Sequence, residues 1–163
     1  MNPATAFSEL SNILGPSPLS GGLNLRRVEE AWGISLPQEV HRLTEAYGDV
    51  MIDDYLFNYG SQTLQSLGEL MSEDVRNGDG LVDDPVLPEK GGMLLWGHTI
   101  EGDKLFLVPR AAGAMWTVSA FRRTKGDWHE TSLPLEEWLV QVFRGGIETE
   151  WLPEWPHRHT FEV

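Results

Sequence analysis

Residues 94–106 predict a β-hairpin at the centre of a sheet. Two apolar stretches are joined at Glu101-Gly102-Asp103. Gly102 can adopt a positive φ without a steric clash, and Asp103 can hydrogen-bond the local backbone, so both suit a tight turn. The apolar residues on either side are expected to lie in the core. The hairpin offers no nucleophile paired with a base and no set of metal ligands.

Further strands are expected on both sides of this hairpin. Alternating and β-branched stretches predict strands at 93–100, 104–109, 114–121 and 127–131, with a turn at Lys125-Gly126. Their short connections favour an antiparallel arrangement. Two short strands, 50–52 and 55–57, are expected at the edge of the sheet, with Asp53-Asp54 between them as a solvated turn.

The spacing of apolar residues predicts helices before and after these strands. Residues 4–14 predict a short, loosely docked helix, and a helix pair is expected between 24 and 48, with Gly33 ending the first helix and Pro37 starting the second. A helix begun by Ser61 would bury one face made of Leu64, Leu67, Leu70, Met71 and Val75. A closing C-terminal helix opens at Pro134. The predicted fold is α+β: a central, mainly antiparallel sheet with flanking helices gathered on one side.

A chain of 163 residues is the size of one domain and can bury a core without covalent cross-links. Within it, we distinguish an N-terminal extension (1–22), an α+β domain (23–146) and a Pro- and Trp-containing tail (147–163), either packed on the domain or extending from it. Residues 77–88 are interpreted as a loop. The absence of cysteine excludes disulfides and zinc–thiolate sites. We expect no signal peptide and no membrane span, and therefore a cytoplasmic protein.

Three groups of residues are candidates for an acid–base or metal-binding role. His98 could pair with Glu101 or Asp103 for acid–base work, but no nucleophile or oxyanion donor is evident beside it. His157 and His159 could place two imidazoles on one side of a strand, although a solvated tail is the simpler interpretation. Residues 74–80 resemble a calcium loop only superficially, because two of the positions that need oxygen ligands would fall on valines. We therefore expect no catalytic residues, no metal and no cofactor.

Seven tryptophans are the strongest feature of the composition. Most of them fall on the apolar stripes of predicted elements and are assigned to the core: Trp32, Trp96, Trp116, Trp128 and Trp138. Trp151 and Trp155 are the two that could be exposed and serve as contact anchors.

Acidic charge is concentrated in the middle of the chain. The net charge is −13, and residues 48–103 hold twelve acidic residues against Arg76 and Lys90, a net −10. Such a chain repels phosphate backbones, so nucleic acid is not an expected partner. It attracts a basic partner and speeds their encounter. The alternative interpretation is that the charge serves solubility alone.

Five blocks appear in an order that resembles the SUKH superfamily, the SMI/KNR-like proteins. They are 32–39 (WGISLPQE), 47–52 (YGDVMI), 96–106 (WGHTIEGDKLF), 116–118 (WTV) and 135–139 (LEEWL). The resemblance implies an α+β fold and a binding protein without catalytic residues. Many bacterial members are immunity proteins that neutralise a toxin domain, and eukaryotic members act as regulatory scaffolds. This chain departs from the family pattern in its N-terminal segment, its tail and the acidic stretch 77–88, where individual specificity could lie.

The leading hypothesis is an immunity protein that neutralises a cognate toxin, such as a nuclease, by stoichiometric binding. The partner-binding residues would be Asp53, Asp54, Asp74, Asp79, Asp83, Asp84 and Glu89. One alternative is an intracellular regulator or scaffold that binds a housekeeping protein. Another is an enzyme that uses His98 with Asp103. The oligomeric state is not predicted.

Overall fold

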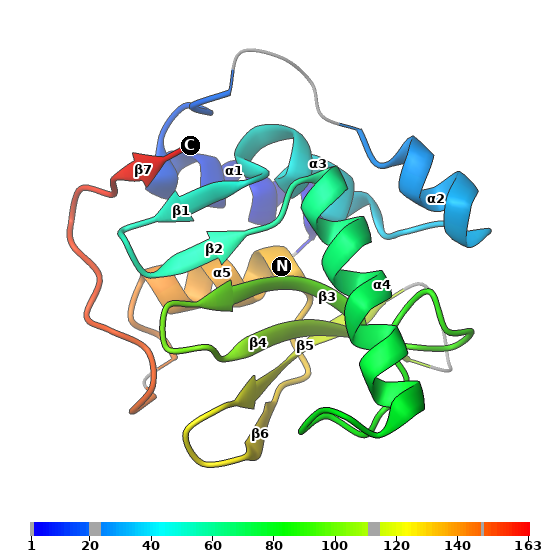
Figure 1. Cartoon of the computed structure of the whole chain (residues 1–163). Helices are drawn as coiled ribbons and strands as arrows, with labels where there is room; N and C mark the ends of the chain where they lie inside the picture. The colour runs from blue at the N-terminus through cyan, green and yellow to red at the C-terminus, as the bar shows by residue number, and fades with distance from the viewer. Residues whose placement is uncertain (1, 20–23, 111–114, 148) are drawn as a thin grey trace.

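The computed structural model describes residues 2–19, 24–110, 115–147 and 149–163. In this part of the chain, five helices flank a seven-stranded antiparallel sheet of order β6-β5-β4-β3-β2-β1-β7 (Figure 1). The helices are α1 (Pro3–Leu14), α2 (Arg26–Trp32), α3 (Gln38–Tyr47), α4 (Ser61–Asn77) and α5 (Leu135–Phe143). The strands are β1 (Val50–Ile52), β2 (Leu56–Asn58), β3 (Leu94–Thr99), β4 (Lys104–Pro109), β5 (Trp116–Arg122), β6 (Asp127–Glu130) and β7 (Phe161–Glu162). The predicted α+β class is confirmed.

The predicted hairpin is β3 and β4, and β3 and β4 are neighbours in the middle of the sheet. Gly102 closes the turn with a φ of 89°. Gly97 lies where β3 and β4 shift register, and a Cβ there would sit 2.7 Å from the carbonyl oxygen of Phe57. Glycine at this position therefore lets β2 and β3 approach closely.

Helices cover both faces of the sheet, so the expectation that they gather on one side is wrong. On one face α5 packs against β5, and α1 and α3 pack against α5. On the other face α4 packs against β3, and α2 packs against α4 (Figure 1). The central strands are apolar on both faces: in β4, for example, Leu105 and Phe106 point in opposite directions and both are buried. A sheet with two apolar faces needs cover on both.

The N-terminal helix belongs to the core, and the prediction of a loosely docked helix is also wrong. Leu10 and Leu14 of α1 are buried in the same apolar cluster as the sheet residues. The hydroxyl of Tyr47 donates a hydrogen bond to the carbonyl of Gly15, at 2.6 Å, and so holds the end of α1 against α3. Residues 2–19 are thus part of the domain rather than an appendage.

The tail packs back onto the domain and completes the sheet. Trp151 is buried, and its carbonyl accepts a hydrogen bond from the Tyr55 hydroxyl. β7 then pairs with β1. Neither of the two short strands predicted at the edge is therefore an edge strand, because β2 lies between β1 and β3, and β1 is covered by β7.

Candidate functional site

The seven predicted partner-binding carboxylates fall into two separate places. One group lies near the C-terminal end of α4 and in the segment 78–93 that follows it. We call the segment 78–93 the acidic loop. The group consists of Asp74 of α4 and of Asp79, Asp83, Asp84 and Glu89 of the acidic loop. Asp53 and Asp54 lie in the turn between β1 and β2, toward the opposite end of the sheet (Figure 1). A single partner-binding surface would therefore be formed by the first group and would not include Asp53 and Asp54.

The acidic loop is held in place by buried apolar residues. Val82, Val86 and Leu87 are buried, and Val86 forms a bridge with Met93. A Cβ on Gly92 would lie 2.6 Å from the carbonyl carbon of Val86, so only glycine allows this close approach. The loop therefore presents its charges from a fixed backbone, while the residues between them anchor it to the core.

The carboxylates of this loop face solvent, and the described residues form no ion pair with them. Asp79, Asp83, Asp84 and Glu89 are exposed. Among the residues that the structure describes, none of these four, nor Asp74, forms an ion pair. Their charge is therefore available to a partner.

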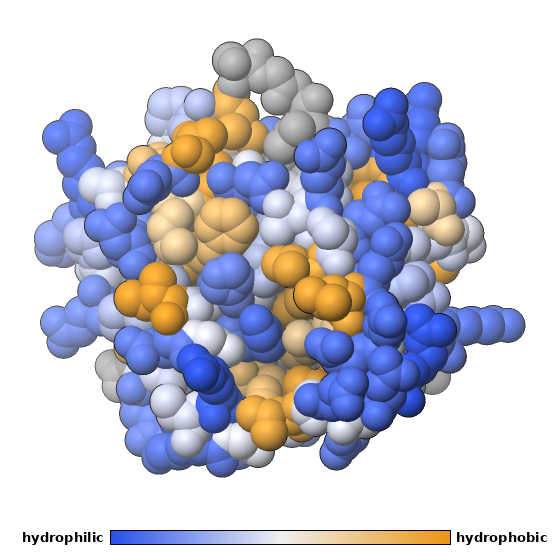
Figure 2. Space-filling model, viewed as in Figure 1, coloured by the Kyte–Doolittle hydropathy of each residue, from blue (hydrophilic) through white to orange (hydrophobic). Residues whose placement is uncertain are grey.

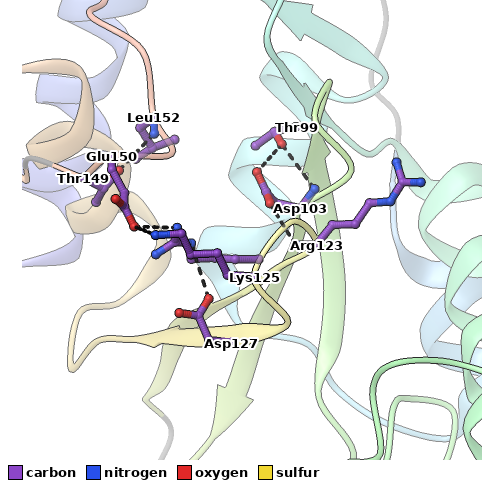
Figure 3. Close-up of polar contacts among 9 residues, drawn as sticks. Thr99, Asp103, Arg123, Lys125, Asp127, Thr149, Glu150 and Leu152 are labelled. Atoms are coloured by element: carbon purple, nitrogen blue, oxygen red, sulfur yellow. Dashed lines mark hydrogen bonds and ion pairs between the residues drawn. The ribbon is translucent and has the colours of Figure 1, made fainter.

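Glu150 shows the opposite arrangement. Its carboxylate lies 2.7 Å from the side-chain nitrogens of both Lys125 and Arg122 (Figure 3). Hydrogen bonds from Lys125 and Arg122 lower the pKa of Glu150 to about 2. The chain thus satisfies this exposed acid with its own cations and leaves the acidic loop unpaired.

The structure adds Glu130 of β6 to the acidic surface formed by the loop. Glu130 of β6 and Asp84 line one hollow of about 460 Å³, together with Trp128, Val108 and Pro109. The β5–β6 hairpin brings Glu130 to the same hollow as Asp84, although the two are far apart in the sequence. Sequence reasoning missed Glu130, because only the packing of the loop across the sheet reveals that the two acids line one hollow.

Asp53 is engaged within the chain, and its turn is not simply solvated. Its side chain and that of His159 are each 4% exposed, with Asp53 Oδ2 2.6 Å from His159 Nδ1. Its other carboxylate oxygen accepts a hydrogen bond from the backbone N–H of Thr160, at 2.8 Å. Asp53 therefore anchors the tail, whereas Asp54 is exposed.

The two tail histidines have different surroundings. His159 lies against Asp53 and the ring of Phe143, whereas His157 is exposed. The expectation of a solvated tail is therefore wrong for His159. In the described ranges, no three histidine or acidic side chains are grouped so that they could hold a metal ion.

His98 does not pair with a carboxylate. Its Nδ1 lies 2.6 Å from the hydroxyl of Tyr59, and its ring stacks on Phe57. Asp103 accepts hydrogen bonds from the Thr99 hydroxyl, at 2.7 Å, and from the backbone N–H of Arg123, at 3.1 Å. The proposed His98–Asp103 acid–base pair is thus not assembled.

His98 is held in its neutral form. Burial, and then the charge of Lys104, lower the pKa of His98, and burial raises the pKa of Tyr59. The phenol therefore keeps its proton, and the hydrogen bond between Tyr59 and His98 Nδ1 joins two neutral groups.

Acidification below about pH 6.5 is expected to destabilise the protein through His98. Because the pKa of His98 is lower in the folded protein than the ordinary 6.5, the unfolded chain binds the proton more readily. The free energy of unfolding therefore falls as the pH drops below 6.5, by at most about 1.4 kcal/mol per pH unit for one group. Urea unfolding of His98→Gln at several pH values should show a smaller slope than that of the unmodified protein.

Two other histidines serve as comparisons in this experiment. His129, whose pKa is also lowered by burial and by Arg122, acts in the same direction, so the slope should shrink rather than vanish. His157 is exposed, and His157→Gln should leave the slope unchanged. Equal slopes for His98→Gln and the unmodified protein would contradict the assignment.

Comparison with known proteins gives no relative. No protein-family model, no curated protein and no solved structure matches this chain. The resemblance to the SUKH superfamily therefore stays a prediction from the sequence blocks. None of the helices in the described ranges combines the length and the apolar character needed to cross a membrane.

Proposed function

We propose that this protein binds a basic partner protein through the acidic loop and Glu130 and thereby neutralises it. The observation that carries the proposal is the set of exposed, unpaired carboxylates on a loop anchored by buried valines and leucine. In the SUKH-type interpretation the protein is an immunity protein, and the partner is the toxin domain of a bacterial toxin met in the cytoplasm. The proposed role is stoichiometric binding and involves no catalysis.

The anchoring of the loop supports this role energetically. Ordering a flexible loop upon binding costs free energy, and a loop already fixed by Val82, Val86 and Leu87 avoids much of that cost. Charge complementarity then raises the association rate, and the effect weakens as salt screens it.

The hollow between Asp84 and Glu130 suits a basic side chain. Trp128 is only partly buried and lines the same hollow as the two carboxylates. An arginine or lysine from a partner could place its charge between the acids and its stem or guanidinium against the indole. Tryptophan at such a place is typical of residues that dominate interface energies.

The second candidate function, a regulator or scaffold that binds a housekeeping protein, would use the same surface. The identity of the partner separates the two. A toxin domain encoded beside this gene, co-expressed with the protein, should cease to inhibit growth and should co-elute with it in gel filtration. Failure of both rescue and co-elution would contradict the immunity role.

Removing three charges from the acidic loop is expected to slow association with the basic partner. For the triple variant Asp79→Asn, Asp83→Asn and Asp84→Asn, we expect the association rate constant at low salt to fall by roughly tenfold or more, since steering of this kind raises on-rates by about 10–1000-fold. Stopped-flow or surface binding at several salt concentrations measures this effect.

The control for the triple variant changes the net charge equally but elsewhere. Glu45, Glu154 and Glu162 are exposed on α3, the tail and β7. At about 0.15 M salt, their replacement by glutamine should leave the association rate within about threefold of the original, because exposed charges farther from the interface than the Debye length of about 8 Å are largely screened there. Equal slowing in both triple variants would show that only overall charge matters.

A further inference from the structure

A small apolar hollow lies between the C-terminal half of α4, the start of the acidic loop and the β3–β4 turn. Its volume is about 190 Å³. Its apolar walls include Met71, Val75, Leu81, Val82 and Phe121. Most of this surface is apolar, and Leu81 at its edge is 71% exposed. Figure 2, which views α4 from the front, shows hydrophobic surface among hydrophilic side chains on this face.

Two cations line the hollow without a partner. In the part of the chain that the structure describes, neither the Lys104 ammonium nor the Arg123 guanidinium has a hydrogen bond or ion pair. Figure 3 shows the Arg123 side chain pointing away from Asp103, Asp127 and Glu150 and toward α4. In a chain of net charge −13, two neighbouring cations left unpaired call for an explanation.

The structure holds these two cations close together. Burial lowers the pKa of Lys104, and the charge of Arg123 lowers it further, as expected of adjacent like charges. Lys104 lies on β4 directly opposite Phe121, and Arg123 follows at the end of β5. An anion placed between the two would relieve their repulsion.

Gly102 makes room for the guanidinium. A Cβ on this residue would lie 2.6 Å from Arg123 Cδ and 3.2 Å from one of its terminal nitrogens, so the Arg123 side chain, as it lies across the turn, occupies the space that glycine leaves free. The backbone N–H of Arg123 is bound to Asp103. The side chain is thus directed to the side of the sheet that faces α4.

These features define the chemistry of a ligand. The apolar walls fit an apolar group, and the volume is below the roughly 300–1000 Å³ of a typical ligand pocket, so that group has the size of a single aromatic or branched side chain. The two cations fit one carboxylate. Asp74 lies on the α4 wall, and its charge would keep the carboxylate on the opposite, hairpin side.

We propose that this hollow binds a carboxylate carried on an apolar group, with Lys104 and Arg123 on the carboxylate and with Met71, Val75 and Phe121 around the apolar part. A small carboxylic acid and the C-terminal residue of a polypeptide share this chemistry. The site adjoins the acidic surface proposed above, with Asp74 at their border, but Lys104 and Arg123 take no part in that surface, so each proposal can fail without the other.

A nuclear magnetic resonance titration of the ¹⁵N-labelled full chain tests the site. The probes are 4-phenylbutyrate, a hexapeptide that ends in phenylalanine with a free carboxylate, and the neutral amide of each. We expect one or both carboxylates to shift the amide signals of Gly80, Val82 and Gly102, and each amide probe to bind at least tenfold more weakly. Binding of the free acid alone identifies a small molecule, and binding of the peptide alone identifies a chain terminus.

Matched variants assign the binding to the two cations. Lys104→Met and Arg123→Met each keep an apolar stem and should weaken binding at least tenfold, with dispersed spectra that show the fold is retained. Lys90→Met removes the same charge from an exposed position in the acidic loop and should leave the affinity unchanged. The proposal is overturned if no carboxylate shifts these signals, if the amides bind equally well, or if all three variants behave alike.

Discussion

Replacement of Trp138 by alanine is expected to lower the free energy of unfolding by about 3–5 kcal/mol, the usual cost of removing a large buried aromatic side chain. Trp138 is 0% exposed. Its ring packs edge-on against Trp96 of β3, with centroids 5.9 Å apart, and stacks on Trp151 of the tail at 6.5 Å. One side chain thus joins α5, the central strand and the tail, and its loss would leave a cavity shared by all three.

The Trp138→Phe variant is the matched test for this packing. Phenylalanine keeps most of the apolar area and the aromatic contacts, so we expect it to lose less than half as much stability as alanine. Urea unfolding followed by far-ultraviolet circular dichroism measures both variants. If the alanine variant lost less than about 1 kcal/mol, the three-way packing would be contradicted.

Replacement of Asp53 by asparagine is expected to destabilise the protein by about 1–3 kcal/mol and to release the tail, because either the buried Nδ1–H of His159 or the backbone N–H of Thr160 would lose its acceptor. A carboxylate only accepts hydrogen bonds, so Asp53 Oδ2 requires the proton on His159 Nδ1. An asparagine side chain has one carbonyl oxygen and cannot accept from both His159 and the Thr160 backbone through separate oxygens.

The neighbouring residue supplies the control for Asp53→Asn. Asp54 has the same backbone φ of 54° as Asp53, but it is exposed. Because asparagine tolerates a positive φ, Asp54→Asn should change stability by no more than about 0.5 kcal/mol. The two variants thus differ only in whether the carboxylate is buried and bonded.

Trypsin cleavage gives a second, local measurement of the tail. Arg158 is exposed and precedes β7, whose Phe161 stacks on Tyr47 with ring centroids 5.8 Å apart. Release of the tail should speed cleavage after Arg158 in Asp53→Asn but not in Asp54→Asn. Equal cleavage rates in the two variants would show that Asp53 does not hold the tail.

Local patterns predicted the secondary structure well. The strands 104–109 and 50–52 match β4 and β1, and the helix after Pro134 is α5. Leu70 is an instructive exception, because it was placed on the buried face of α4 and is 56% exposed. The periodicity of a helix identifies an apolar stripe, but the width of the surface that covers it depends on the neighbouring elements.

The burial of the tryptophans could likewise be predicted only where they lie in periodic strands or helices. Of the five tryptophans predicted in the core, Trp96 and Trp138 are buried, because their strand and helix stripes point inward. The other three are only partly buried against it: Trp32, Trp116 and Trp128. Trp151 was expected to be a possible contact anchor and is buried against Trp138 and His129. It lies in a segment without regular periodicity, so its environment depends on where the tail docks.

The candidate surfaces depend even more on tertiary structure. The acidic loop could be recognised from composition, but its charges could not be sorted into free and engaged ones. Asp53 contacts His159, and Asp84 and Glu130 line one hollow, only because the tail and the β5–β6 hairpin pack where they do. The pair of Lys104 and Arg123 likewise follows from the register of β4 and β5 and from the missing side chain of Gly102.

The sequence by itself thus determined the central hairpin, the α+β class and the acidic character of the chain, because turn chemistry, apolar periodicity and charge are local properties. Only the tertiary structure decided that helices cover both faces, that Asp53 anchors the tail, and that two cations share an apolar hollow. These features depend on contacts between residues far apart in the chain, and such contacts are set by strand register and packing rather than by any local pattern.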